Sequence, residues 1–86
     1  MIRILHTADW HLGQSFFGYD RTDEHLHFLD WLCDTIRQHE VDVLIIAGDV
    51  FDVSNPSAAS QRMFYRFVSR VTTENPALQL VVVAGN

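Results

Sequence analysis

Residues 41–52 read VDVLIIAGDVFD, and this stretch decides the fold. An unbroken apolar run that stops at Gly48-Asp49 is typical of a strand buried on both faces of a parallel sheet, with an acidic group delivered to the sheet edge. Two other stretches have the same form, since residues 1–8 are followed by Asp-Trp-His and residues 78–84 by Gly-Asn. Each of the three expected strands therefore ends at a side chain that can bind a metal ion.

Two helical patterns separate these strands. Residues 20–40 place leucine, cysteine and isoleucine on one face, with Asp20 or Thr22 expected as the N-cap. Residues 56–74 place methionine, phenylalanine and valine on one face, with Pro56 expected in the first helical turn. Three strands alternating with two helices predict an α/β fold, a parallel β-sheet with flanking helices in the order βαβαβ.

Residues 12–19 contain two glycines and show no sustained period, so we expect a loop there. Its aromatic pair, Phe16 and Phe17, is expected to fold back onto the core. The alternative is a surface that contacts a substrate or partner.

The composition is that of one small folded domain. Of the 86 residues, 48% are hydrophobic and 20% charged, which excludes a disordered tail. The sequence stops at Asn86 directly after a buried-type strand, so we expect residues 1–86 to be the truncated N-terminal part of a larger domain. The single cysteine, Cys33, cannot form an internal disulfide, and we expect neither a secretory signal nor a membrane span. A reducing, cytoplasmic setting fits these features best.

The carboxyl ends of parallel strands meet at one edge of a sheet, so we expect Asp9, Asp49 and Asn86 to converge there. His11 follows Asp9 closely enough to reach the same point. Oxygen ligands with one imidazole suit a divalent ion such as manganese. Asp49 is the candidate to bridge two ions, and Gly48 leaves room for them. The formal charge of -5 supports a role for cations, because a phosphate-bearing substrate needs local positive charge.

Other polar and aromatic residues are given structural interpretations. His6 lies in a strand interior and is expected to be a hydrogen-bonded core histidine or a neighbour of the ligands. Trp10 is expected to pack beside the site rather than stack on a nucleobase. The remaining polar residues are expected to be ordinary helix residues: His25, His27, His39 and the arginines Arg62, Arg66 and Arg70.

The motifs Asp-x-His, Gly-Asp-x-x-Asp and Gly-Asn, in this order, resemble the calcineurin-like metallophosphoesterase superfamily. Within it, HTADWHLGQ at residues 6–14, FLDWL at 28–32 and AGDVFD at 47–52 are similar to the SbcD-type nuclease subunits of bacterial SbcCD complexes, relatives of the Mre repair nucleases. The resemblance covers the whole chain but only the start of that family's catalytic domain.

This resemblance implies a two-metal DNA exonuclease and endonuclease acting in repair and recombination. It implies that Asp9 and His11 bind one Mn²⁺, that Asp49 bridges two and that Asn86 binds the second. Asp52 then lies beside the ligands or on the substrate side. The expected general-acid histidine follows Asn86 and is absent, so the fragment alone is expected to be inactive. The implied partners are DNA, an SbcC-type coiled-coil ATPase subunit and a second copy of the full-length subunit.

Two alternatives stay open from the residues alone. The first is a phosphatase or cyclic-nucleotide phosphodiesterase of the same superfamily, because the expected ligands do not separate these substrates. The second is a non-hydrolytic nucleotide-binding or receiver-like module. The absence of a glycine-rich phosphate loop and of any lysine in the sequence weakens it.

Overall fold

The computed structural model describes residues 1–13, 15–16, 19–51 and 56–84. Its elements are β1 (Ile4–Ala8), β2 (Ser15–Phe16), β3 (Tyr19–Asp20), α1 (Thr22–Gln38), β4 (Val43–Gly48), α2 (Ala58–Glu74) and β5 (Gln79–Ala84). The expected α/β fold with three parallel strands and two helices is confirmed.

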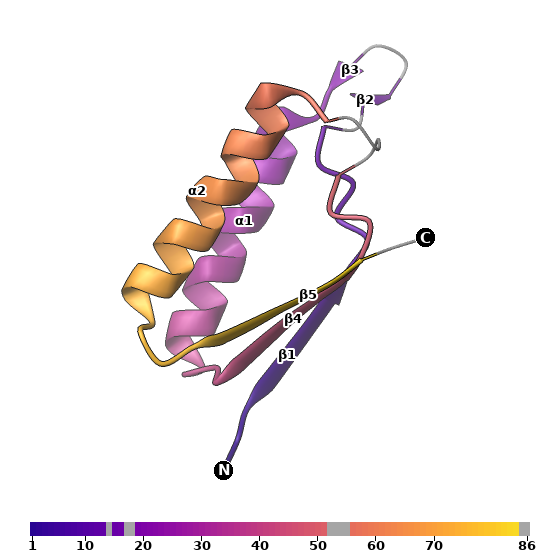
Figure 1. The fold of residues 1–86 in the computed structure, drawn as a ribbon. Helices are drawn as coiled ribbons and strands as arrows, with labels where there is room; N and C mark the ends of the chain where they lie inside the picture. Colours follow the sequence, from indigo (N-terminus) through magenta and orange to yellow (C-terminus); the bar gives the residue numbers. More distant parts are fainter. Residues whose placement is uncertain (14, 17–18, 52–55, 85–86) are drawn as a thin grey trace.

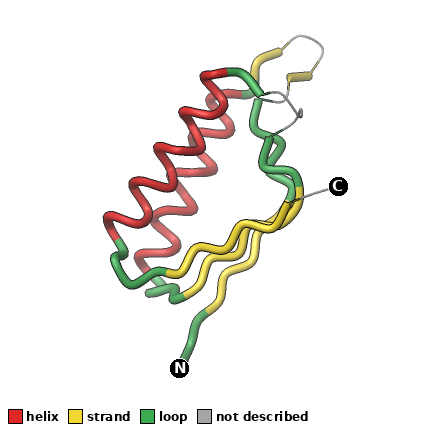
Figure 2. The backbone as a smooth tube through the Cα atoms, viewed as in Figure 1, coloured by secondary structure: helices red, strands yellow, loops and turns green. Residues whose placement is uncertain are grey.

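The main sheet has the order β1-β4-β5, and both pairs of neighbours are parallel. Figures 1 and 2 show α1 and α2 side by side on one face of this sheet. The central strand supplies Leu44 and Ile46, which are fully buried and point toward the helices. The apolar run that suggested a buried strand thus forms the middle of the sheet.

Both helices lie against a single apolar core. Its fully buried members include Leu12, Leu32, Ile36 and Val71, so the loop after β1 contributes to the core as well as the helices. Cys33 belongs to the same cluster, and burial raises the pKa of its thiol. The thiol therefore stays protonated at neutral pH, in keeping with the expected role as a small apolar side chain.

The helix α1 begins and ends through backbone contacts. The expected cap at Asp20 or Thr22 is wrong, because Arg21 occupies the N-cap position and makes no side-chain capping bond. At the other end the N–H groups of Glu40 and Val41 donate to the carbonyls of Arg37 and Ile36, at 3.3 and 3.1 Å. This is a Schellman motif, with Glu40 at φ 50° in the place where glycine is usual.

The helix α2 begins later than expected. Pro56 precedes the helix, and Ser57 is the N-cap, whose Oγ accepts a hydrogen bond of 3.1 Å from the N–H of Ser60. A serine hydroxyl satisfies one of the free N–H groups of a first turn, which proline cannot do. The expectation of proline inside the first turn is therefore wrong by two residues.

The segment expected to be a loop contains a small antiparallel sheet. β2 pairs with β3 through Ser15 opposite Asp20 and Phe16 opposite Tyr19. Pairing over two residues leaves no periodic signal in a sequence. The expectations for Phe17 and for the Phe16 side chain fall outside the described part of the chain.

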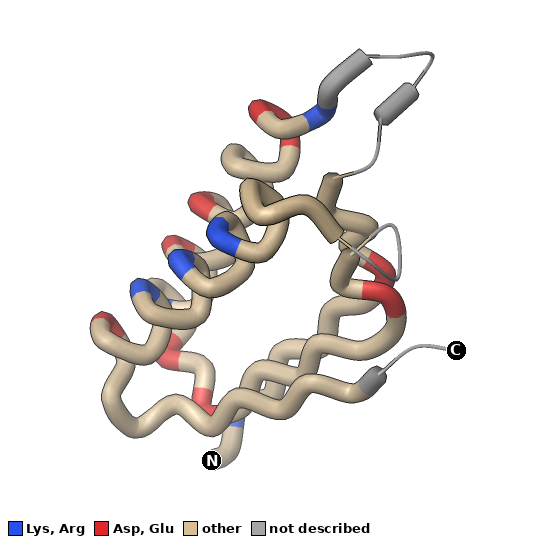
Figure 3. Tube along the Cα trace, turned by 45° about the horizontal axis from the view of Figure 1, so that its top comes forward, with Lys and Arg blue, Asp and Glu red and all other residues tan. Residues whose placement is uncertain are grey.

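Charged residues gather on the outer surface of the helices. Figure 3 shows basic positions in a row along α2, with acidic positions nearby and others at the ends of the strands. Arg70 of that row pairs with Asp30 of α1 at 2.7 Å and with Glu74 at 3.4 Å. Because these side chains are partly exposed, the pairs orient the helices more than they stabilise them.

The second face of the sheet carries no helix among the described residues. Apolar side chains are exposed there, with Ile4 at 61%, Val81 at 43% and Val83 at 49% of their full surface. Neither described helix is long and apolar enough to span a lipid bilayer.

A candidate metal centre at the strand ends

The segments that follow β1 and β4 stay paired after the strands end. Three backbone hydrogen bonds of 2.8 to 3.0 Å continue the pairing: Asp9 N–H to Ala47 O, His11 N–H to Asp49 O, and Leu12 N–H to Val50 O. A parallel bridge between Leu12 and Phe51 keeps the register of the strands themselves. These bonds place two segments some forty residues apart in the sequence side by side.

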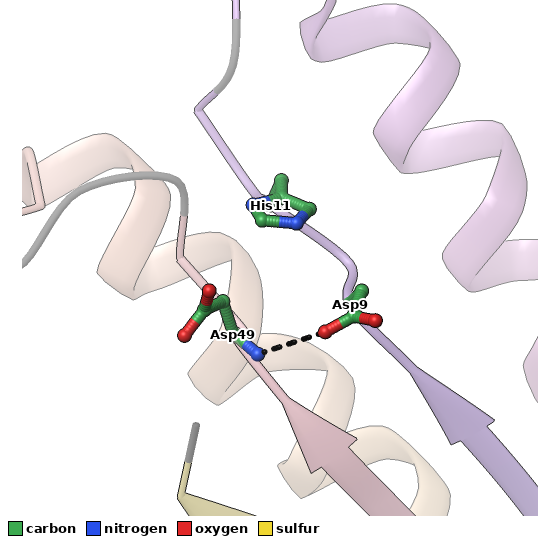
Figure 4. Close-up of side chains that lie close together, drawn as sticks. All are labelled: Asp9, His11 and Asp49. Atoms are coloured by element: carbon green, nitrogen blue, oxygen red, sulfur yellow. Dashed lines mark hydrogen bonds between the residues drawn. The ribbon is translucent and has the colours of Figure 1, made fainter. Parts of the chain in front are cut away.

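Three of the expected ligands come together at this point. One ligand atom each of Asp9, His11 and Asp49 lies within 4.8 Å of the other two. Figure 4 shows the three side chains on adjacent segments, with the backbone N–H of Asp49 donating to Oδ1 of Asp9 at 3.4 Å. Asp9 is exposed and the other two are half-buried, so the cluster is open to solvent.

The cluster fits a divalent cation. Two atoms bound to one ion at about 2.1 Å lie no more than about 4.2 Å apart. Atoms within 4.8 Å of one another can reach this spacing by small side-chain rotations. Two carboxylates and one imidazole also form a donor set that manganese and similar ions accept.

The backbone at the cluster adopts an uncommon conformation. Asp9 has φ 55° and His11 has φ 51°, both in the left-handed region. Such conformations cost about 1 to 3 kcal/mol each and persist where the surrounding structure fixes them, often at functional sites. The strand pattern gave no sign of this turn, although aspartate and histidine tolerate it better than most residues.

Gly48 forms one wall of the cluster. It has φ 82°, and a Cβ atom added to it would collide with Oδ1 of Asp9 and come within 3.0 Å of its Cγ. Only glycine therefore lets the β4 end approach the Asp9 carboxylate so closely. The expectation that Gly48 makes room in the site agrees with this geometry.

Two further expected site residues, Asp52 and Asn86, lie outside the described residues. His6 is described, and it is exposed at the middle of β1. Its expected burial in the core is wrong, because it points to the face of the sheet away from the helices, whereas Leu5 and Thr7 point toward them.

The interpretation of the other histidines needs one change. His27 is exposed on α1, and His39 ends that helix with its carbonyl accepting a bond from Arg3. His25, in contrast, is buried, 8% exposed, in the first half of α1. It is therefore a packed histidine and not a surface residue.

Trp10 lies between two of the clustered residues and points into the core. It is 8% exposed, and its Nε1–H donates to the hydroxyl of Thr7 at 2.9 Å. The expected packing beside the site matches this position. Thr7 was not singled out by sequence reasoning, although a hydroxyl at an inward-facing strand position is a signal that could have found it.

Comparisons with known proteins agree with the strand-end motifs. A family model described as Calcineurin-like phosphoesterase matches residues 2–86. Over 85 residues the chain is 49% identical to the SbcD subunit of the nuclease SbcCD from Escherichia coli (strain K12), 47% to that of Rhodobacter capsulatus and 40% to that of Bacillus subtilis (strain 168). These alignments cover 99% of this chain and 21 or 22% of each relative. The chain thus spans about a fifth of the length of the curated relatives it matches.

Proposed function

The chain belongs to the calcineurin-like phosphoesterase family, and we therefore propose that residues 1–86 form the N-terminal part of a metal-dependent nuclease that hydrolyses phosphodiester bonds in DNA. The observation that carries this proposal is the meeting of Asp9, His11 and Asp49 at the ends of two parallel strands. DNA is proposed as the substrate because the relatives at 40 to 49% identity are named as nuclease subunits.

In this proposal Asp9 and His11 hold one divalent ion, Asp49 bridges to a second and Asn86 contributes to the second. The ions are proposed to be Mn²⁺. When bound, such a pair lowers the pKa of water and offsets the charge that develops on a phosphoester oxygen.

The residues of this chain set the charge and shape of the site. The carboxylates of Asp9 and Asp49 repel a phosphodiester, so bound cations are required before substrate can approach. The overall charge of -5 acts in the same direction. Gly48 keeps the wall of the site low, and the backbone bonds between the two segments hold the ligands at a fixed separation.

The partners proposed for the full-length protein are DNA, an SbcC-type ATPase subunit and a second copy of itself. The first two follow from the name of the relatives, which are subunits of a nuclease called SbcCD. The described residues contain no basic surface large enough to hold DNA on its own, since the net charge is negative.

Substrate class is tested with the full-length protein, MnCl2 and two substrates, linear duplex DNA and a chromogenic phosphoester. We expect release of nucleotides from DNA at a rate at least about a hundredfold above that of the chromogenic ester at equal concentration, since binding of the extended substrate adds to the rate. EDTA should stop both reactions. A rapid phosphomonoester reaction with intact DNA would favour a phosphatase instead.

The isolated 86-residue polypeptide is expected to release no nucleotides from DNA above the metal-only blank. Its described residues supply three of the proposed ligands, and a two-metal site needs more donors than these. The measurement is an overnight incubation at high protein concentration with Mn²⁺. Cleavage that disappears in the Asp49→Asn form of the same polypeptide would show that residues 1–86 suffice.

A further inference from the structure

Two residues of the candidate centre have the same backbone problem. Asp9 and His11 both hold left-handed φ values, and Trp10 is the residue between them. Asp9 is exposed and His11 half-buried, so neither side chain is fixed by deep packing. The buried side chain of this tripeptide is that of Trp10.

Trp10 is held on every side that the structure describes. Its indole N–H donates to Oγ1 of Thr7 at 2.9 Å, which fixes the ring against the strand that precedes it. Its faces and edges meet three aromatic rings, Phe28 of α1 at 5.5 Å and Phe64 and Phe67 of α2 at 6.2 and 5.3 Å between centroids. All three are edge contacts, which aromatic rings prefer.

This arrangement decides the direction of the chain at the site. An indole fixed in depth and rotation leaves the two flanking residues little freedom to turn over. The side chains of Asp9 and His11 must then leave the core on the side where Asp49 lies. A looser residue at position 10 would let the Asp9–His11 segment relax to an ordinary φ and carry the ligand atoms apart.

We propose that Thr7 and Trp10 are positioning residues that hold Asp9 and His11 in the left-handed conformation in which they bind a divalent cation. This inference rests on the proposed function, because it gives the ordered turn its purpose. Thr7 acts only through Trp10, and Trp10 only through the backbone, so neither touches the ion or the substrate.

The test uses the full-length protein and Mn²⁺ alone, with free Mn²⁺ measured by electron paramagnetic resonance. Thr7→Val keeps the shape of the side chain and removes the hydroxyl, and Thr7→Ser keeps the hydroxyl. Thr72→Val is the matched control, since the Thr72 hydroxyl bonds to the α2 backbone. Trp10→Phe is the second variant, with the exposed Trp31→Phe as its control.

We expect Thr7→Val and Trp10→Phe to bind Mn²⁺ about tenfold more weakly, the lower end of what loss of a ligand-orienting partner costs. Thr7→Ser and both controls should bind within about twofold of the unsubstituted protein. The unfolding midpoint of each protein in EDTA separates this effect from folding. A residue that only packs lowers the midpoint and leaves the affinity of the folded protein unchanged.

Each outcome is decisive. Unchanged Mn²⁺ affinity in folded Thr7→Val overturns the positioning role, whatever happens to its midpoint. If Trp10→Phe does not fold, the comparison of Thr7→Val with Thr7→Ser still decides. Failure of the unsubstituted protein to bind Mn²⁺ overturns the proposed function itself, and this result is distinct because every variant then behaves alike.

Discussion

Asp49→Asn in the full-length protein is expected to lower the rate of metal-dependent DNA cleavage by at least about a thousandfold. Asparagine has the same shape but carries no charge, and the proposed bridge between two ions needs a carboxylate with two anionic oxygens. Loss of about 4 kcal/mol of charge stabilisation in the transition state corresponds to this factor. The measurement is the initial rate of nucleotide release at saturating Mn²⁺.

The fold should survive this substitution. The Asp49 side chain is half-buried, and the bond from its backbone N–H to Asp9 does not depend on the carboxylate. We expect an unfolding midpoint in EDTA equal to or slightly above that of the unsubstituted protein, because one of two neighbouring negative charges is gone. Asp23→Asn, on the exposed first turn of α1, is the matched control and should retain full activity. Activity above about a tenth of the original in Asp49→Asn would exclude the bridging role, since a tenfold loss is only about 1.4 kcal/mol.

Gly48→Ala is expected to damage both the stability and the metal site. A methyl group at φ 82° costs about 1 to 2 kcal/mol of backbone strain. It would also occupy the space of the Asp9 carboxylate, so that side chain must move away from Asp49. We expect the free energy of unfolding in EDTA to fall by about 2 kcal/mol or more. Mn²⁺ binding should weaken at least about tenfold.

Gly13→Ala separates these two effects. Gly13 has φ 91°, and its added Cβ would meet Oγ of Ser60 in α2 at 2.6 Å instead of a candidate ligand. We expect a comparable loss of stability with Mn²⁺ affinity nearly unchanged. Equal losses of affinity in both variants would mean that Gly48 affects the site only through general destabilisation of the fold.

The elements that follow long-range rules were predictable from the sequence. The run of residues 43–48 has no polar interruption, so it could only be a central strand, and the strand-end motifs then had to share one edge. Their meeting at Asp9, His11 and Asp49 needed no knowledge of side-chain packing. It follows from parallel pairing alone.

Features decided by single contacts were not predictable. The start of α2 depends on one hydroxyl, that of Ser57, and the sequence offered several capping residues nearby. The β2–β3 pair rests on two residues in each strand. The left-handed turns at Asp9 and His11 depend on how Trp10 seats between both helices, which no local pattern encodes.

The hydrogen bonds that extend the pairing of β1 and β4 beyond their ends have a consequence for folding. Parallel strands joined through a helix come together late, and a slip by one residue would turn every inward side chain outward. A cation held by both strand ends at once would bind only the correctly aligned sheet, and so would favour that alignment over its slipped competitors. In such a protein the ion acts as a clasp that checks the alignment of the sheet before it takes part in any reaction.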